Sequence, residues 1–125
     1  MKIIVFDTET NGLIPRDKNI VSENLHIMPY IVQLSYILFD TISKKIVVEH
    51  DFVIRVPDQV EISKESSNVH GITKETSNTS GISIIDALEN FSICLKKADI
   101  VIAHNISFDT NMIAIESLRN NMDVR

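Results

Sequence analysis

Apolar and polar positions divide the chain into short strand-like runs and longer helix-like segments. An apolar run over about residues 2–8 ends in acidic side chains, and residues 30–39 and 45–56 are rich in β-branched and aromatic residues. Residues 40–44 separate these two later runs, so the pattern predicts an antiparallel hairpin. Another short apolar run, residues 99–103, predicts a further strand.

Helical spacing of apolar residues is clearest in the second half of the chain. Residues 83–97 have apolar side chains at intervals of three and four, which predicts a helix with one apolar face. The residues of that face are Ile84, Leu88, Phe91 and Leu95. A second helix is predicted to begin near Ser107, with an inward face of Phe108, Met112, Ile115 and Leu118. Residues 63–70 predict a shorter helix that stops at Gly71.

The remaining segments predict loops. Residues 11–29 contain a glycine, two prolines and several charges, and residues 78–81 form a polar cluster that predicts a turn. The resulting order is strand, hairpin, helix, strand, helix, which predicts an α/β fold with a mixed sheet flanked by helices. A length of 125 residues fits a single domain, residues 1–125.

Composition narrows the class of protein. Hydrophobic residues make up 44% of the chain and charged residues 23%, which is ordinary for a globular protein. The net charge of −5 argues against binding nucleic acid through the overall field, but not against an acidic metal site that acts on it. We see neither a signal-peptide core nor a membrane span, so we expect a soluble, intracellular (cytoplasmic) protein without a membrane partner.

The first apolar run ends in two acids, and this is the clearest chemical signal in the chain. Asp7 and Glu9 are two residues apart on a predicted strand, so their side chains project from the same face. Adjacent carboxylates repel each other unless a cation lies between them. Mg²⁺ or Mn²⁺ fits best, because both prefer oxygen ligands and commonly keep substrate phosphates in their coordination shell.

A second acidic position follows the last predicted strand. If residues 99–103 run parallel to the first strand, the carboxyl ends of both strands lie at one edge of the sheet, where ligands gather in α/β folds. Asp109 would then approach Asp7 and Glu9. Three carboxylates at one edge would suit a two-metal site that cleaves phosphodiester bonds.

Two segments together resemble a known family. Residues 6–13 (Phe-Asp-Thr-Glu-Thr-Asn-Gly-Leu) resemble the first motif of the DnaQ-like 3′→5′ exonucleases, the DEDD group with an RNase H-like fold. Residues 104–109 (His-Asn-Ile-Ser-Phe-Asp) resemble their second motif. Between them, residues 69–73 are similar to a connecting segment of the proofreading-subunit branch, and the resemblance covers nearly the whole chain.

The resemblance implies a role for each matched residue. Asp7, Glu9 and Asp109 would be the catalytic metal ligands of a two-metal Mg²⁺ or Mn²⁺ site, with Asp7 bridging both ions. Other residues of the two motifs would bind a nucleic-acid 3′ end, whether DNA or RNA. They are Thr8, Thr10, Leu13, His104, Asn105 and Phe108. The family also allows for a polymerase partner.

One departure from the family changes the expectation for activity. The third motif of the family supplies a general-base histidine and a fourth metal-binding aspartate on a later helix, and the sequence up to Arg125 contains neither. The last strand of the sheet and the final helix are also expected to be missing. We therefore expect a partial exonuclease domain whose activity is impaired unless a C-terminal segment completes it, since general-base catalysis contributes about 10²–10⁴-fold.

Several alternatives stay open from the sequence alone. Asp7 and Glu9 could be solvated residues at a strand end, Asp109 could stabilise a helix N-terminus, and His104 with Asn105 could simply form a turn. A domain of this family could also be an inactive binding or regulatory module, or a gene remnant. A phosphatase of the haloacid dehalogenase type would use Asp7 as its nucleophile, but its second acid is ordinarily Asp rather than Glu.

Overall fold

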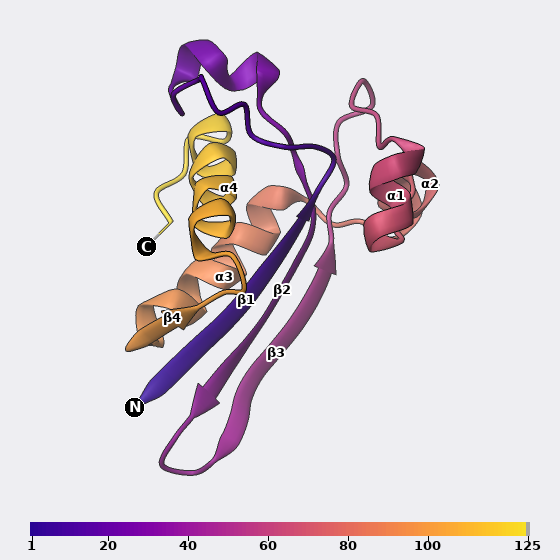
Figure 1. Cartoon of the computed structure of the whole chain (residues 1–125). Helices are drawn as coiled ribbons and strands as arrows, with labels where there is room; N and C mark the ends of the chain where they lie inside the picture. The colour runs from indigo at the N-terminus through magenta and orange to yellow at the C-terminus, as the bar shows by residue number, and fades with distance from the viewer. Residues whose placement is uncertain (125) are drawn as a thin grey trace.

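A four-stranded mixed sheet forms the centre of the protein (Figure 1). The structure is a computed structural model that describes residues 1–124. The strands are β1 (Lys2–Thr10), β2 (Ile31–Asp40), β3 (Lys45–Val53) and β4 (Ile100–Ile102), in the spatial order β3-β2-β1-β4. β1 and β3 pair antiparallel with β2, whereas β4 pairs parallel with β1. The carboxyl ends of β1 and β4 therefore lie at the same edge, so the condition set in the sequence analysis is met.

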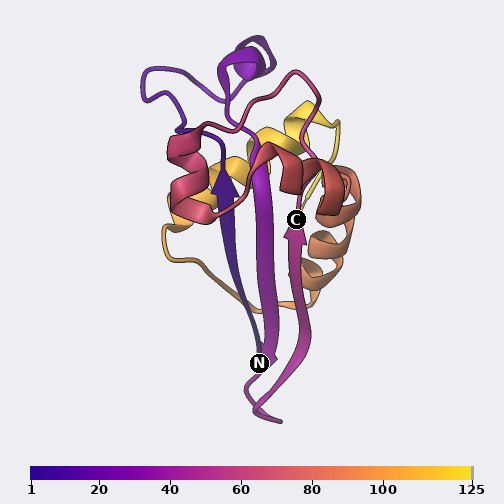
Figure 2. The same ribbon diagram turned by 90° about the vertical axis from the view of Figure 1, so that its right-hand side faces the viewer.

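Helices cover one face of this sheet and border its upper end. The long helices α3 (Ile84–Lys97) and α4 (Ile106–Arg119) pack against one face, and α1 (Lys64–His70) and α2 (Lys74–Ser80) lie at the end to which β1 points. Figure 2 looks onto the opposite face, which α1 and α2 border only at the top. A short 3₁₀ helix, η1 (Ser22–Ile27), interrupts the loop before β2. No helix within residues 1–124 is long and apolar enough to cross a membrane.

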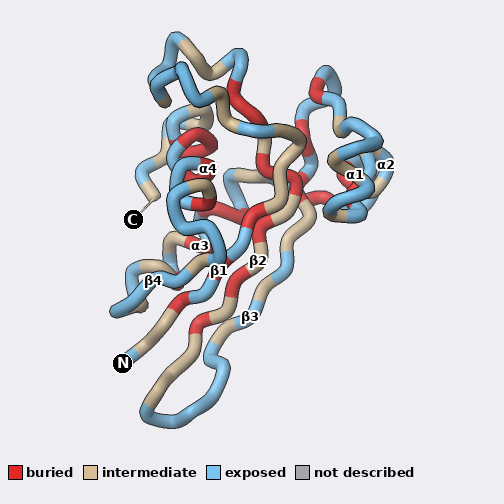
Figure 3. Tube along the Cα trace, viewed as in Figure 1, coloured by how far each residue is buried: buried red, intermediate tan, exposed pale blue. Residues whose placement is uncertain are grey.

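Alternation along the strands determines which side chains form the core. In β1 the even-numbered Ile4, Phe6 and Thr8 are buried against the helices, while Val5 and Asp7 are exposed on the other face. Figure 3 shows that buried positions concentrate in the middle of the sheet and on the inner sides of α3 and α4. β4 is the exception, because its three residues are 40–45% exposed.

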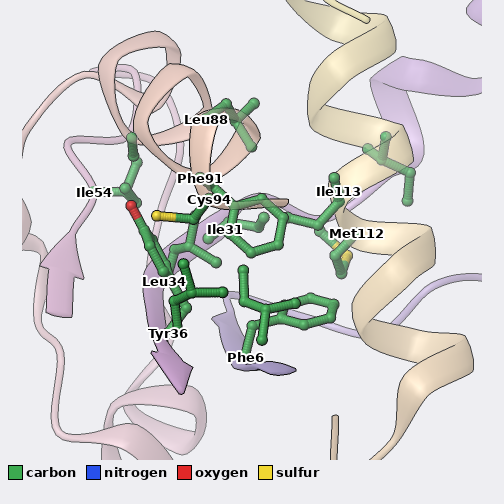
Figure 4. Packing of buried hydrophobic residues seen from close by; sticks show 14 of the residues in the cluster. Phe6, Ile31, Leu34, Tyr36, Ile54, Leu88, Phe91, Cys94, Met112 and Ile113 are labelled. Atoms are coloured by element: carbon green, nitrogen blue, oxygen red, sulfur yellow. The ribbon is translucent and has the colours of Figure 1, made fainter. Parts of the chain in front are cut away.

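Phe91 lies at the centre of the core. It extends from α3 between Phe6 of β1 and Tyr36 of β2, with ring centroids 5.1 Å away in both cases (Figure 4). Leu88 of the same helix and Met112 of α4 are completely buried in the same cluster. These contacts fasten α3 and α4 to the sheet and so determine where the start of α4 meets β1.

The main elements agree with the sequence patterns. The hairpin is present, and the helix predicted over residues 83–97 spans Ile84–Lys97 with Ser83 as its N-cap, whose side chain accepts a hydrogen bond from the Ile85 N–H. The shorter helix ends at Gly71, which has a φ of 78°, a conformation that glycine adopts without strain.

Three details of the sequence reading were wrong. Residues 78–80 do not form a turn but the last part of α2, because Thr73 caps that helix and the hydroxyl of Ser77 binds the backbone of Ile54 and Val56. The segment predicted as a plain loop, residues 11–29, contains η1. Leu118 does not point inward, since it is 36% exposed.

We expect the Phe91→Ala substitution to lower the free energy of unfolding by about 3–5 kcal/mol, because it empties a site in contact with two other aromatic rings. Urea unfolding of the variant and of the wild-type chain measures the difference. Ile93→Ala, on the same helix but 56% exposed, is the matched control and should change stability by about 0.5 kcal/mol or less. Equal effects of the two substitutions would contradict this packing.

Candidate active site

The acidic residues of β1 lie side by side on the open face of the sheet. Asp7 is exposed and Glu9 partly buried, and their carboxyl groups are close enough to share a hydrogen bond. Partial burial raises the pKa of both, and the negative charge of Asp109 raises both further. For Asp7, a nearby His104 opposes the shift. The site therefore holds negative charge at an electrostatic cost.

Asp109 anchors α4 to β1. It is only 2% exposed, and its Oδ1 accepts hydrogen bonds from the Thr8 N–H at 3.1 Å and the Thr8 hydroxyl at 2.7 Å. β4 pairs with β1 only as far as Val5, so Thr8 lies beyond the end of that ladder. Asp109 thus accepts the hydrogen bond of the Thr8 N–H, for which a longer β4 would have supplied a backbone carbonyl. Its contacts are with β1, and not with the N-terminal amides of its own helix.

The three acids do not form one shared coordination shell in this structure. Within residues 1–124, no group of three or more His, Cys, Asp or Glu side chains is arranged to hold a metal ion. Asp109 influences Asp7 and Glu9 through its charge, while its Oδ1 is engaged by Thr8. The Asp7–Glu9 pair itself fits a Mg²⁺ or Mn²⁺ ion, because such ions often take one or two carboxylates and complete their shell with water and phosphate oxygens.

A depression of about 270 Å³ lies beside the acids, between the end of β1, the loop after it, α1 and the start of α4. Four of the residues predicted to bind substrate line it: Thr8, Thr10, Leu13 and Phe108. Glu9 and Gly12 also line it, so the acidic strand end forms one of its walls.

The opposite wall was missed by sequence reasoning. Ser66, Val69 and His70 of α1 face the depression. Their spacing of three and four residues is that of one helix face, and this signal was present in the sequence. His70 lies at the end of α1, where its Nδ1 accepts the Ile72 N–H at 3.0 Å, and its side chain also contributes to this wall.

The other ring nitrogen of His70 lies inside this wall. Because Nδ1 accepts a hydrogen bond, the neutral ring carries its proton on Nε2. Nε2 is buried and has no hydrogen bond of normal geometry to any residue in the described part of the chain. Burial lowers the pKa of His70, and a contact with the backbone of Thr10 opposes this shift.

The other predicted residues lie apart from this depression. His104 borders a second one, of about 440 Å³, on the open face of the sheet next to Asp7. Asn105 is the N-cap residue of α4 but makes no side-chain cap hydrogen bond. A larger, mainly apolar depression of about 610 Å³ lies between α3, α4 and β4 and contains none of the three acids.

A mixed sheet whose first strand ends in two acids, with a third acid on the helix after a parallel strand, defines a domain suited to metal-assisted phosphate chemistry. Residues 4–123 match the sequence profile of the RNase_T family, described as exonuclease, and the chain belongs to this family. The resemblance to DnaQ-like exonucleases and the RNase H-like fold are thereby confirmed. No curated protein sequence matches the chain closely enough to count as a relative.

Solved structures show the same fold at low sequence identity. E. coli exonuclease I in complex with a dT13 oligonucleotide has a TM-score of 0.77 at 16% identity, and 98% of this chain covers 24% of that one. The nuclease domain of 3′hExo, a DEDDh family member bound to rAMP, has a TM-score of 0.71 at 12% identity, with coverages of 99% and 62%. Exonuclease I from Methylocaldum szegediense has a TM-score of 0.70 at 18% identity, with coverages of 89% and 22%. The chain thus spans about a quarter of the exonuclease I chains.

We expect Asp7→Asn to raise the melting temperature at pH 7 in the absence of metal. The pKa of Asp7 is raised in the folded state, so folding becomes less favourable as the pH rises from the ordinary Asp pKa of 3.8 through the folded-state pKa. The variant escapes this loss, and its advantage should disappear below pH 3.8. Thermal unfolding between pH 3 and pH 8 measures it. Asp58→Asn, at an exposed acid in another part of the chain, should show no such gain.

Proposed function

We propose that this domain removes nucleotides from nucleic-acid 3′ ends with the help of Mg²⁺ or Mn²⁺. The observation that carries the proposal is the position of Glu9, whose carboxyl group contacts that of Asp7, in the wall of the 270 Å³ depression. A metal ion on the acids would bind the phosphate of a nucleotide while the depression holds its nucleoside. Membership of the exonuclease family supports the same reading.

The metal would be held by Asp7 and Glu9, with Asp109 beside them. When bound, the ion supplies positive charge for the phosphate oxygens and makes a bound water more acidic. Both acids would project toward the ion from one face of β1, whose backbone is held by pairing with β2 through Asp7 and Glu9. The positive charge of the bound ion would offset the repulsion between the carboxylates and so favour their ionised forms.

The depression would hold the terminal nucleoside. Leu13, Val69 and Phe108 offer apolar surface to a base. Apolar surface reads little of the identity of a base, so cutting should be largely independent of sequence. The matching exonuclease I structure contains dT13 and the 3′hExo structure contains rAMP, so DNA and RNA ends are both substrates to test.

Cutting by the part of the chain that the structure describes should be slow, because its three acids do not share one coordination shell. The engagement of Asp109 by Thr8 also favours a second candidate, a domain that binds nucleic-acid ends without cutting them. A polymerase partner and a proofreading task remain predictions from the sequence.

Digestion of 5′-labelled single-stranded DNA and RNA with Mn²⁺ tests the proposal. We expect slow shortening from the 3′ end that a 3′-phosphate blocks and that Asp7→Ala reduces by at least about 100-fold, since Asp7 would be a metal ligand. Asp58→Ala is the control for a lost exposed acid and should cut like the wild type. Asp7-dependent binding of the 3′ end without any shortening would favour the binding module. Neither binding nor shortening would contradict both.

Val69→Asp should weaken binding of a 3′-hydroxyl oligonucleotide by about tenfold or more, because it adds a negative charge to the wall of the depression, close to the phosphates. The side chain is 82% exposed, so the fold should be unaffected. Ile42→Asp, at an 85% exposed position in the hairpin turn, is the matched control with the same chemical change. Fluorescence anisotropy with Mn²⁺ measures both. Equal affinities of Val69→Asp and the wild type for the oligonucleotide would show that the nucleotide does not bind in this depression.

A further inference from the structure

Helix α4 contacts the sheet through two buried carboxylates. Asp109 near its start and Glu116 near its end are seven residues apart, so they lie on the same face about 10 Å apart along the axis. Asp109 accepts the N–H of Thr8, and Glu116 Oε2 accepts the N–H of Ile31 at 2.9 Å. Between them α4 packs through apolar side chains such as Met112 and Ile115. The apolar contacts fasten the helix to the sheet, and the two hydrogen bonds add a directional constraint at each end of this face.

The donor that Glu116 binds belongs to an irregular point in the sheet. The register of β1 and β2 shifts between Glu9 and Thr10, so that Glu9 pairs with Gln33 while Thr10 pairs with Ile31. Ile31 is completely buried, and its N–H would be costly without an acceptor. Such irregularities often lie next to active sites, where they change the direction of a strand. Glu116 therefore satisfies the backbone at the place where the acidic strand changes register.

Arg119 extends this contact to the loop before β2. Its Nη1 lies 2.6 Å from Glu116 Oε1, and its Nη2 donates to the carbonyls of Met28 and Pro29 at 3.1 Å. The guanidinium also lies over the ring of Tyr30, 3.6 Å from its centroid. The backbone of Tyr30 exchanges hydrogen bonds with Asn11, which is directly after the acidic strand.

The buried pair is not explained by stability alone. The Glu116 side chain is 2% exposed and that of Arg119 14%. Burial raises the pKa of Glu116, and Arg119 and the Ile31 N–H oppose this shift. Removing two charges from water is costly, and replacing such a pair by apolar residues of similar size is often neutral or stabilising. A directional contact that fixes the position of the helix is the role for which a buried ion pair is suited.

We propose that Glu116, held by Arg119, is a positioning residue that sets the register of α4 along the sheet and so keeps Asp109 on Thr8 beside Asp7 and Glu9. Glu116 itself touches none of the three acids and acts through the helix. The inference rests on the proposed function, because the site that it positions is the proposed metal site.

Two double variants of the 125-residue chain test this role. Glu116→Leu with Arg119→Met removes the hydrogen bond and leaves no unpaired charge. Glu116→Gln with Arg119→Met differs from it by restoring an oxygen that can accept the Ile31 N–H. Three quantities are measured for each: the melting temperature, the hydrogen-exchange rate of the Thr8 amide relative to that of Phe6 in the same strand, and the affinity for Mn²⁺. Leu88→Ala, in α3, controls for a general loss of stability.

In the leucine variant we expect a lower melting temperature, because the buried Ile31 N–H loses its acceptor, and Leu88→Ala provides a comparable loss of stability in another helix. The Thr8 amide should exchange at least about tenfold faster relative to Phe6, and Mn²⁺ affinity should fall about 10- to 100-fold. The glutamine variant should recover most of both losses, and Leu88→Ala should show neither change. Should the leucine variant not fold, Glu116→Asp, with a side chain one methylene shorter, is expected to show the same faster exchange at Thr8.

An unchanged Thr8 exchange ratio in the leucine variant, or in Glu116→Asp if that variant replaces it, would overturn the positioning role. Asp7→Asn separates this result from a failure of the proposed function. If the wild type and Asp7→Asn bind Mn²⁺ with equal affinity, the proposal that Asp7 binds the metal is contradicted. The Thr8 ratio then still decides whether Glu116 positions Asp109.

Discussion

The hydrogen bonds between Thr8 and Asp109 are the interaction on which the rest of the site depends. They join the first strand to a helix that follows it by about a hundred residues, and they do so beyond the point where β4 stops pairing. A backbone donor that would otherwise be buried without a partner receives an acceptor, and the acceptor brings a third negative charge next to two others. One contact thus both anchors α4 to β1 and brings Asp109 to the other two acids.

This contact explains why the site is stable although it is electrostatically unfavourable. Asp7 and Glu9 have raised pKa values because burial and neighbouring charges disfavour their ionised forms. The aromatic cluster around Phe91 and the anchoring of α4 hold the acids together against that repulsion. Active sites commonly contain such unfavourable groups, supported by the surrounding fold. Here the supporting residues lie on the face of the sheet that the helices cover, whereas Asp7 and Glu9 lie on the open face.

How much the sequence could predict depended on the range of the interaction. Strand alternation placed Asp7 and Glu9 on one face, and helical spacing located Ile84–Lys97, because both patterns are local. The sequence left the parallel pairing of β1 with β4 as a condition, and the structure meets it. The engagement of Asp109 by Thr8 and the wall formed by Ser66, Val69 and His70 depend on contacts between distant segments, and a single sequence does not contain these distances. Residues 78–80 were misread because their polar composition suits a turn as well as a capped helix.

The short strand β4 has a consequence for how the protein behaves in concentrated solution. Ile100, Val101 and Ile102 are each 40–45% exposed, and within residues 1–124 β1 is the one strand that pairs with them. An apolar edge with free backbone donors and acceptors is a template to which further strands can add. Three residues form only a short template, which limits how firmly a second chain can attach. Association through this edge would involve neither the three acids nor the depression proposed for the nucleotide.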